Sequence, residues 1–159
     1  MQEPEKVKET RNLNERLGFE ADIFYHEESG KTTEDAERAL GIESRLIIKC
    51  LLLKSKKGDY LGAIVRGSDR VNFKELESLS GYKGLRLAHE IDVKERLGFE
   101  IGGVPAVIFN EKGIRTYVDN KVLEVEYVVG AGGDEHYGMK FAPRQLTEKL
   151  DYIPSNISI

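Results

Sequence analysis

One lysine interrupts an apolar run and is the first residue whose type and place could do chemistry. Lys49 lies in the middle of residues 46–53, which are otherwise all apolar. Such a run predicts a strand buried on both faces, where an unpaired ammonium is costly and burial lowers the pKa of a lysine. Two interpretations follow: the long side chain carries its charge out to solvent, or the charge faces a cavity and acts on a ligand.

The glycine-rich segment at residues 98–105 is the second candidate. Adjacent Gly102 and Gly103 allow positive φ and close approach of the backbone, and Pro105 makes the exit of the bend rigid. Exposed amides in such a bend can bind an anion or a carbonyl oxygen. On this segment alone, a plain tight bend between a helix and a strand is the simpler interpretation.

A second glycine-rich segment, residues 130–138, directly follows a predicted strand. It is not a P-loop, because no Lys-Ser/Thr pair follows the glycines, and no long helix opens after it as a dinucleotide fingerprint requires. A functional loop and a solvated acidic turn are equally favoured here. The candidate residues are Gly130, Gly132, Gly133, Asp134 and His136.

Metal and nucleophile patterns are weak in this sequence. His26, His89 and His136 are far apart and lack a metal-ligand spacing, so no metal or other cofactor is predicted. On a strand, the side chain of Cys50 points to the face opposite Lys49, and ordinary core packing is favoured for it over a role as nucleophile. Ser68 has no recognisable His/Asp partners, which disfavours a serine hydrolase.

The elements that must position these residues alternate between helices and strands. Capping residues, closing glycines and a first-turn proline predict helices at residues 4–18, 33–40, 72–79, 88–97 and 143–150. Apolar and alternating runs predict strands at residues 21–26, 46–53, 60–65, 106–109, 114–118 and 122–129. Two of the connections are short enough for hairpins, 46–53 with 60–65 and 106–109 with 114–118. The expected class is mixed α/β with a largely antiparallel or mixed sheet.

Length and charge limit the function classes. The 159 residues predict one domain over 1–159, and 24 basic against 28 acidic residues give a net charge of −4. This balance argues against a protein that coats nucleic acid non-specifically, although a local basic groove stays open. The single cysteine suits a reducing compartment, and no signal peptide or membrane span is visible, so a soluble cytoplasmic domain is expected.

The order of these features resembles the YbaK/prolyl-tRNA synthetase-associated editing-domain family of trans-acting aminoacyl-tRNA deacylases. The resemblance covers about residues 36–150, including residues 39–42 before the lysine strand. The Lys49 strand and the 102–105 bend are its most specific matches, and the segment at 132–136 is similar to the glycine-rich, histidine-containing loop of some members.

What the resemblance implies is a compact α/β fold around a mostly antiparallel, barrel-like sheet with surrounding helices and a central pocket. The pocket would receive the 3′ end of a mischarged tRNA and hydrolyse the ester between amino acid and ribose. Lys49 would be the essential lysine, and the amides of Gly102 and Gly103 would orient the carbonyl oxygen. Residues that would shape the substrate pocket are Pro105, Gly130, Gly132, Gly133, Asp134 and His136.

Two departures from the family pattern bear on specificity. Some members carry an aspartate where this chain has Gly138, with its acids instead at Asp134 and Glu135, and the 104–106 exit is shorter than in others. The net negative charge also opposes tRNA binding. A basic cluster that could help is equally well a solvated hairpin tip: Lys54, Lys56, Lys57, Arg66 and Arg70.

Three functions therefore stay open at this point. The leading one is a free-standing deacylase for Ala-, Cys- or Ser-charged tRNA of the tRNA-Pro type, with an aminoacyl-tRNA synthetase as a second partner. The second is a catalytically inactive module that binds tRNA or a synthetase on the same fold. The third is a small-molecule anion-binding protein that uses Lys49 and the glycine amides. Oligomeric state is not predicted.

Overall fold

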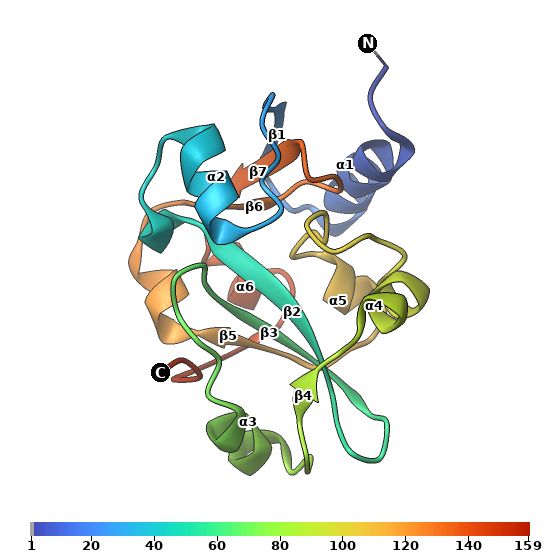
Figure 1. Cartoon of the computed structure of the whole chain (residues 1–159), viewed down its shortest axis with the longest axis vertical. Helices are drawn as coiled ribbons and strands as arrows, with labels where there is room; N and C mark the ends of the chain where they lie inside the picture. The colour runs from blue at the N-terminus through green and yellow to red at the C-terminus, as the bar shows by residue number, and fades with distance from the viewer. Residues whose placement is uncertain (1) are drawn as a thin grey trace.

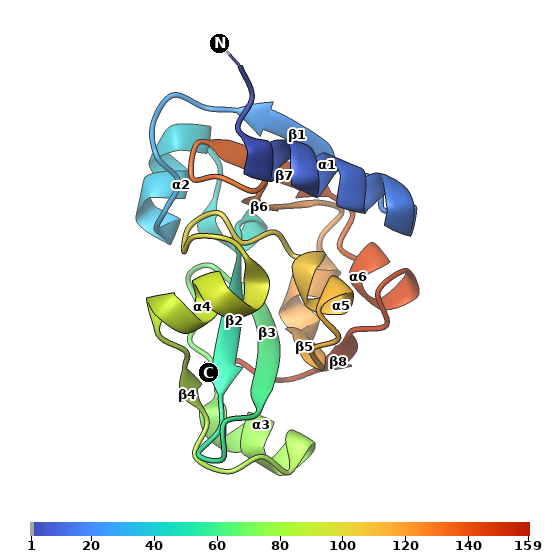
Figure 2. The same cartoon turned by 90° about the vertical axis from the view of Figure 1, so that its right-hand side faces the viewer.

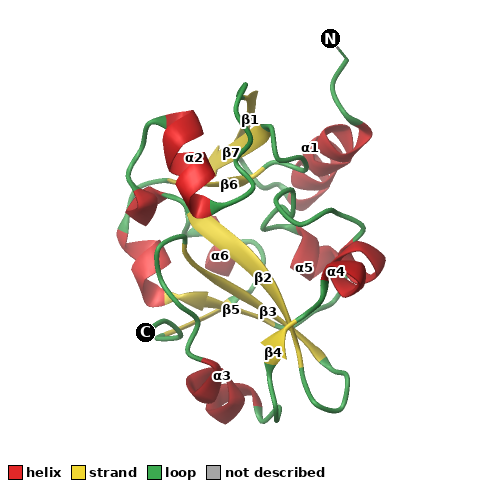
Figure 3. Ribbon diagram, viewed as in Figure 1, coloured by secondary structure: helices red, strands yellow, loops and turns green. Residues whose placement is uncertain are grey.

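The computed structural model describes residues 2–159 and contains two β-sheets with helices around them (Figures 1 and 3). The smaller sheet has the strand order β1-β7-β6, and the larger has the order β4-β2-β3-β5-β8. Their bounds are β1 (Asp22–Tyr25), β2 (Ile48–Lys54), β3 (Tyr60–Arg66), β4 (Arg86–Leu87), β5 (Thr116–Asp119), β6 (Val128–Ala131), β7 (Tyr137–Phe141) and β8 (Ile153–Ser155).

Most of the strand pairs are antiparallel. β7 pairs antiparallel with both β1 and β6, and β2 pairs antiparallel with both β3 and β4. Only the β3–β5 and β5–β8 pairs are parallel. An isolated parallel bridge between Ile47 and Val129 joins the two sheets. The predicted class, mixed α/β with a mostly antiparallel, barrel-like sheet and surrounding helices, is confirmed.

Helices lie around both sheets, and α1 crosses the smaller sheet at one end of the molecule (Figure 2). The α-helices are α1 (Glu5–Leu17), α2 (Thr33–Leu40), α3 (Phe73–Ser80), α4 (Glu90–Leu97), α5 (Ile108–Glu111) and α6 (Gln145–Glu148), with 3₁₀ turns η1 (Ser44–Leu46) and η2 (Asn120–Glu124). The side chains of Thr32 and Asn72 cap α2 and α3. α1 to α4 each end at a left-handed glycine, as predicted: Gly18, Gly41, Gly81 and Gly98.

The larger sheet is buried on both faces. Ile48 and Leu52 of β2 belong to the larger apolar cluster, which also takes side chains from α4 and α5. Leu53 belongs to a second cluster, and Leu51 packs against it. Because successive residues of a strand point to opposite faces, this division confirms the two-sided burial predicted from the apolar run.

The predicted second hairpin is wrong. Residues 106–109 do not form a strand; Ile108 and Phe109 begin α5, and β5 pairs in parallel with β3 instead of folding back on residues 106–109. The apolar run there is buried all round, so its sequence has no period that separates a strand from a helix.

Two other elements are shorter than predicted, and three strands were not predicted. Most of the strand expected at residues 122–129 is irregular: η2 occupies its start, and β6 begins only at Val128. The carboxylate of Asp119 accepts a hydrogen bond from the Lys121 amide and caps η2. The last helix is shorter than expected, and the short strands β4, β7 and β8 were not predicted.

Candidate functional site

A cavity of about 280 Å³ lies along one edge of β2. β3 covers the opposite edge over the full length of the strand. On the cavity edge, β6 pairs with the chain at Ile47, just before β2, and β4 pairs with Leu53 and Lys54 at the end of β2. The backbone between these two contacts is therefore uncovered and forms one wall of the cavity.

The uncovered edge presents backbone hydrogen-bonding groups at Cys50. The Ala88 amide donates to the carbonyl oxygen of Leu52, which places that carbonyl on the cavity edge. Since the backbone groups of every second residue in a strand point to the same edge, the amide and carbonyl of Cys50 point there as well. Neither β4 nor β6 reaches Cys50. A ligand in the cavity can therefore receive one donor and one acceptor from the strand.

The cavity wall is divided into an apolar part and a polar part. Aliphatic side chains of β2, α4 and β6 and of the loop after α4 form the apolar part: Ile48, Leu52, Val93, Leu97, Val104 and Val129. The polar part comes from the segment between β1 and α2, from β2 and from the β6–β7 turn: His26, Lys31, Thr32, Thr33, Lys49, Glu135 and Tyr137. This division suits a ligand with one apolar end and one polar or charged end.

Lys49 supplies a partly buried charge to the polar part of the wall. Burial lowers the pKa of its ammonium, and the nearby charges of Asp69 and Glu34 oppose this effect. Among residues 2–159, no carboxylate lies close enough to Lys49 to form a salt bridge; Asp69 instead pairs with Arg66 at 2.9 Å. The ammonium is therefore available to a negatively charged or polarised oxygen of a ligand.

The structure brings only some of the predicted site residues to the cavity. Lys49, Gly102 and Gly130 line it. The others are not part of the lining: Gly103, Pro105, Gly132, Gly133, Asp134 and His136. Their predicted roles in substrate binding stay predictions, and their observed contacts are with neighbouring protein segments.

The bend after α4 packs closely against two other loops. A Cβ on Gly103 would lie 2.9 Å from the carbonyl oxygen of Gly133, and one on Gly102 would lie 2.8 Å from Cγ of Lys31. The Gly103 amide already donates to the Glu100 carbonyl oxygen at 2.9 Å. Within the described residues the Gly102 amide has no hydrogen-bond acceptor, so it is the better placed of the two to receive a ligand oxygen.

The second glycine segment forms the turn of the β6–β7 hairpin. The Asp134 carboxylate accepts a hydrogen bond from the His136 amide, and the His136 carbonyl accepts one from the His26 amide at 2.8 Å. The Glu135 carbonyl accepts another from the Gly30 amide at 2.7 Å. These bonds hold the segment after β1 against the hairpin, so the hairpin shapes the polar wall mainly by positioning that segment.

Gly138 lines the cavity at the position that departs from the family pattern. A Cβ there would lie 2.6 Å from Cζ of Phe24. A larger residue at this position would therefore have to displace the Phe24 ring.

The segment at residues 26–36 is the part of the site that the sequence did not reveal. His26, Gly30, Lys31, Thr32 and Thr33 all line the cavity. Their only local signal is a short polar stretch before the Thr32 cap, which is also typical of an ordinary helix entrance. Their place beside β2 depends on the long-range bonds to the β6–β7 hairpin.

Residues 2–159 contain neither a metal-ligand cluster nor a membrane-crossing helix. In this range, no three His, Cys, Asp or Glu side chains gather as metal ligands would. No helix in the same range has the length and apolar character that a membrane crossing requires.

Cys50 is expected to behave as a packing residue. Burial raises the pKa of its thiol to about 12, so little thiolate forms at pH 8 although Cys50 is one of the residues that line the cavity. Iodoacetamide at pH 8 should therefore leave the folded protein unlabelled and label the urea-unfolded chain, as mass spectrometry would show. Stoichiometric labelling of the folded protein would contradict this.

The uncovered strand edge, the Lys49 ammonium and the apolar wall together form a cavity whose chemistry suits a small acyl or phosphoryl group. The sequence profile of the aminoacyl-tRNA editing domain matches residues 27–149, and the chain belongs to that family. Both the Lys49 strand and the two glycine segments lie inside the matched region.

Relatives and solved structures agree with this assignment. The proline–tRNA ligase of Xanthomonas oryzae pv. oryzae (strain MAFF 311018) is 34% identical over 102 residues, which cover 64% of this chain and 18% of the ligase. The proline–tRNA ligase of Fervidobacterium nodosum is 27% identical over 135 residues, which cover 78% of this chain and 23% of the ligase. The chain thus spans about a fifth of the length of these curated relatives.

Two crystal structures superpose on nearly the whole chain. One, described as a "putative trans-editing enzyme for prolyl tRNA synthetase", has a TM-score of 0.86 at 26% identity and covers 99% of both chains. A hypothetical protein has a TM-score of 0.86 at 29% identity, covering 98% of this chain and 100% of its own.

Proposed function

We propose that this protein is a trans-editing aminoacyl-tRNA deacylase that hydrolyses the ester of a mischarged tRNA in the cytoplasm. The observation that carries the proposal is the Lys49 ammonium, partly buried and without a salt-bridge partner among residues 2–159, at the wall of a cavity in an editing-domain fold. A group of this kind is stabilised by an anionic or polarised oxygen, which the 3′ end of a charged tRNA supplies.

The cavity supports a mechanism based on positioning. Aminoacyl esters are already activated, so their hydrolysis needs orientation and stabilisation of developing negative charge more than a strong protein nucleophile. Lys49 would act on the ester or adjacent phosphate oxygen through its charge. The Gly102 amide and the uncovered backbone of Cys50 would orient the carbonyl and the amino group. A water, the neighbouring ribose hydroxyl or a substrate thiol would attack the ester.

The apolar part of the wall supports a small, uncharged amino acid as the group removed. Alanine, cysteine and serine remain the candidate amino acids. A tRNA of the proline type is the candidate carrier because the relatives above are proline–tRNA ligases and one similar structure is described as acting with prolyl-tRNA synthetase. An association with that synthetase is part of the same proposal.

A panel of mischarged tRNAs tests the function directly. The purified protein, incubated with tRNA-Pro carrying alanine, cysteine, serine or proline, should release one or more of the first three and leave the proline ester intact. Ester loss would be followed by acid-gel separation of charged from uncharged tRNA. Binding of the whole panel without ester loss would instead support an inactive tRNA- or synthetase-binding module.

A further inference from the structure

The five-residue turn between β2 and β3 carries a concentration of positive charge that the catalytic proposal does not use. Lys56 and Lys57 lie in this turn and are exposed, as is Lys83 in the loop before β4. The Lys56 amide donates to the Lys83 carbonyl oxygen at 2.8 Å, so the two loops lie together. Arg86 of β4 is paired in register with Lys54 of β2. We call these five residues, Lys54, Lys56, Lys57, Lys83 and Arg86, the basic tip.

The basic residues that the sequence suggested as one cluster do not all lie together in the folded chain. Arg66 lies at the opposite end of β3 from the tip, and its side chain is bound to Asp69 at 2.9 Å. Lys83 and Arg86 join the tip from a segment about thirty residues further along the chain. The folded structure therefore gathers cations that the sequence separates, in a chain whose net charge is −4.

Most of the charges of the basic tip are not neutralised by neighbouring side chains. In the described part of the chain, Lys54 forms a salt bridge with Asp92 at 3.4 Å, whereas Lys56, Lys57, Lys83 and Arg86 form none. The carboxylates beside the tip are Asp59 in the turn, Asp92 on α4, and Glu77 on α3, which accepts a hydrogen bond from the Leu85 amide at 2.9 Å. A surface of this kind favours a polyanion that can contact several cations at once.

The basic tip adjoins the cavity. Leu87 and Ala88, which directly follow Arg86, line the cavity wall, as does Leu52, two residues before Lys54. Two residues of a strand span about 7 Å, so the tip begins within that distance of the wall. Leu87 is exposed, follows Arg86 and lines the cavity, so it adds apolar surface between the tip and the cavity on which an unpaired base can pack.

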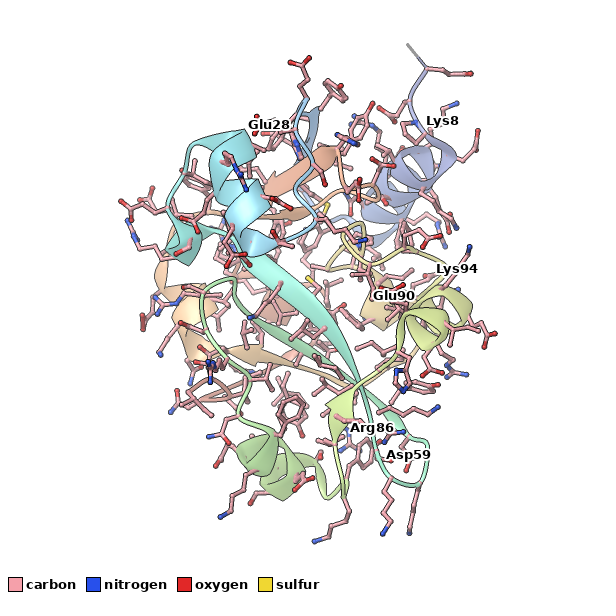
Figure 4. All side chains as sticks on the ribbon, in the orientation of Figure 1. Lys8, Glu28, Asp59, Arg86, Glu90 and Lys94 are labelled. Carbon is pink, nitrogen blue, oxygen red and sulfur yellow. The ribbon has the colours of Figure 1, made fainter. Side chains whose placement is uncertain are left out.

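The other end of the cavity rim has the opposite charge. The segment that forms the polar wall carries Glu27, Glu28 and Glu34 beside Lys31, and Asp35, which pairs with Arg38 at 2.8 Å. Figure 4 shows Glu28 at this end of the molecule and Arg86 with Asp59 at the other. A polyanion is repelled from the acidic end and attracted to the tip, so its direction of approach is determined by charge.

We propose that the basic tip binds the phosphodiester backbone of the tRNA acceptor stem and directs the 3′ end past Leu87 into the cavity. This inference rests on the proposed function for its partner, and it assigns that partner a surface and a direction of approach. The tip would contribute to the affinity for tRNA and would leave the chemical step unchanged.

The test compares a long and a short substrate. The triple variant Lys56→Gln/Lys57→Gln/Lys83→Gln removes three exposed charges without removing a salt bridge. With full-length mischarged tRNA, kcat/KM should fall roughly ten- to a hundredfold at low salt, and the slope of log(kcat/KM) against log[salt] should decrease by about 2 to 3. With an aminoacylated 3′-terminal adenosine, which carries no phosphodiester for the tip to bind, kcat/KM should be unchanged.

The triple variant Lys8→Gln/Lys112→Gln/Arg144→Gln is the control of equal charge, because it removes one cation each from α1, from the end of α5 and from beside α6. Lys8 and Arg144 pair with Glu5 and Glu148 on the surface, where such pairs contribute little to stability. It should retain the wild-type rate and salt slope. Equal losses on both substrates, or equal losses for the two triple variants, would overturn the proposal.

Anisotropy of fluorescently labelled, uncharged tRNA separates this inference from the proposed deacylase activity. Weaker binding to the tip variant than to the control variant would support the surface even if no ester in the panel were hydrolysed. Equal binding of tRNA by both variants would overturn the proposed binding surface, whether or not the protein hydrolyses the ester.

Discussion

Replacement of Lys49 by Ala should lower kcat/KM for deacylation by roughly a hundredfold or more while the domain stays folded. The magnitude is that of removing one group that stabilises negative charge in an enclosed active site. Stability should change little, because Lys49 is only partly buried and forms no salt bridge within residues 2–159. Single-turnover deacylation of mischarged tRNA and circular dichroism in urea would measure the two effects.

Lys8→Ala is the matched control for this experiment. Lys8 is also partly exposed, but it lies on α1 and pairs with Glu5 at 3.6 Å, away from the cavity lining. The control should retain wild-type activity. If the Lys49→Ala protein were active, Lys49 would not be central to the mechanism. The interpretation that its side chain carries the charge out to solvent would then stand.

Replacement of Gly133 by Ala should lower the free energy of unfolding by roughly 3 kcal/mol. Gly133 has φ +107°, and a Cβ there would lie 2.5 Å from the Lys6 carbonyl oxygen and 2.7 Å from Oγ1 of Thr10. Both atoms belong to α1, and Thr10 is fully buried and donates to Lys6. The substitution would force α1 away from the β6–β7 hairpin.

Gly113→Ala separates the backbone cost from the packing cost. Gly113 also has a positive φ, +66°, but no heavy atom lies within 4 Å of the position that a Cβ would take there. This variant should lose only about 1 kcal/mol, the cost of a left-handed backbone with a side chain. Urea unfolding of both variants measures the difference; equal losses would show that contact with α1 is not the reason.

The sequence contained enough local information for most of the helices. The caps at Thr32 and Asn72 and the closing glycines act within a few residues, so their effect is visible without the rest of the chain. The strand prediction for residues 106–109 failed for the opposite reason. These residues are buried all round, and only their neighbours in space determine that α5 forms there.

The site could be predicted only in part, because long-range contacts complete it. Lys49 was visible as a charge in an apolar strand, and it does line the cavity. The segment at residues 26–33 is positioned by bonds from the hairpin about one hundred residues later, which no local pattern encodes. Glycines at 103, 132 and 133 were visible as candidates, but their observed contacts are close backbone packing.

The uncovered edge of β2 has a consequence for association between chains. An unpaired strand edge is a template on which a strand of another molecule can add, and proteins usually cover or shorten such edges. Here the edge is bounded by β6 at one end and β4 at the other, and the α2 segment and α4 contribute to the walls in front of it. The unpaired edge between these two contacts is therefore short, and a short edge is a poor template for an added strand. The same enclosure that creates a binding site thus protects the protein from edge-to-edge aggregation.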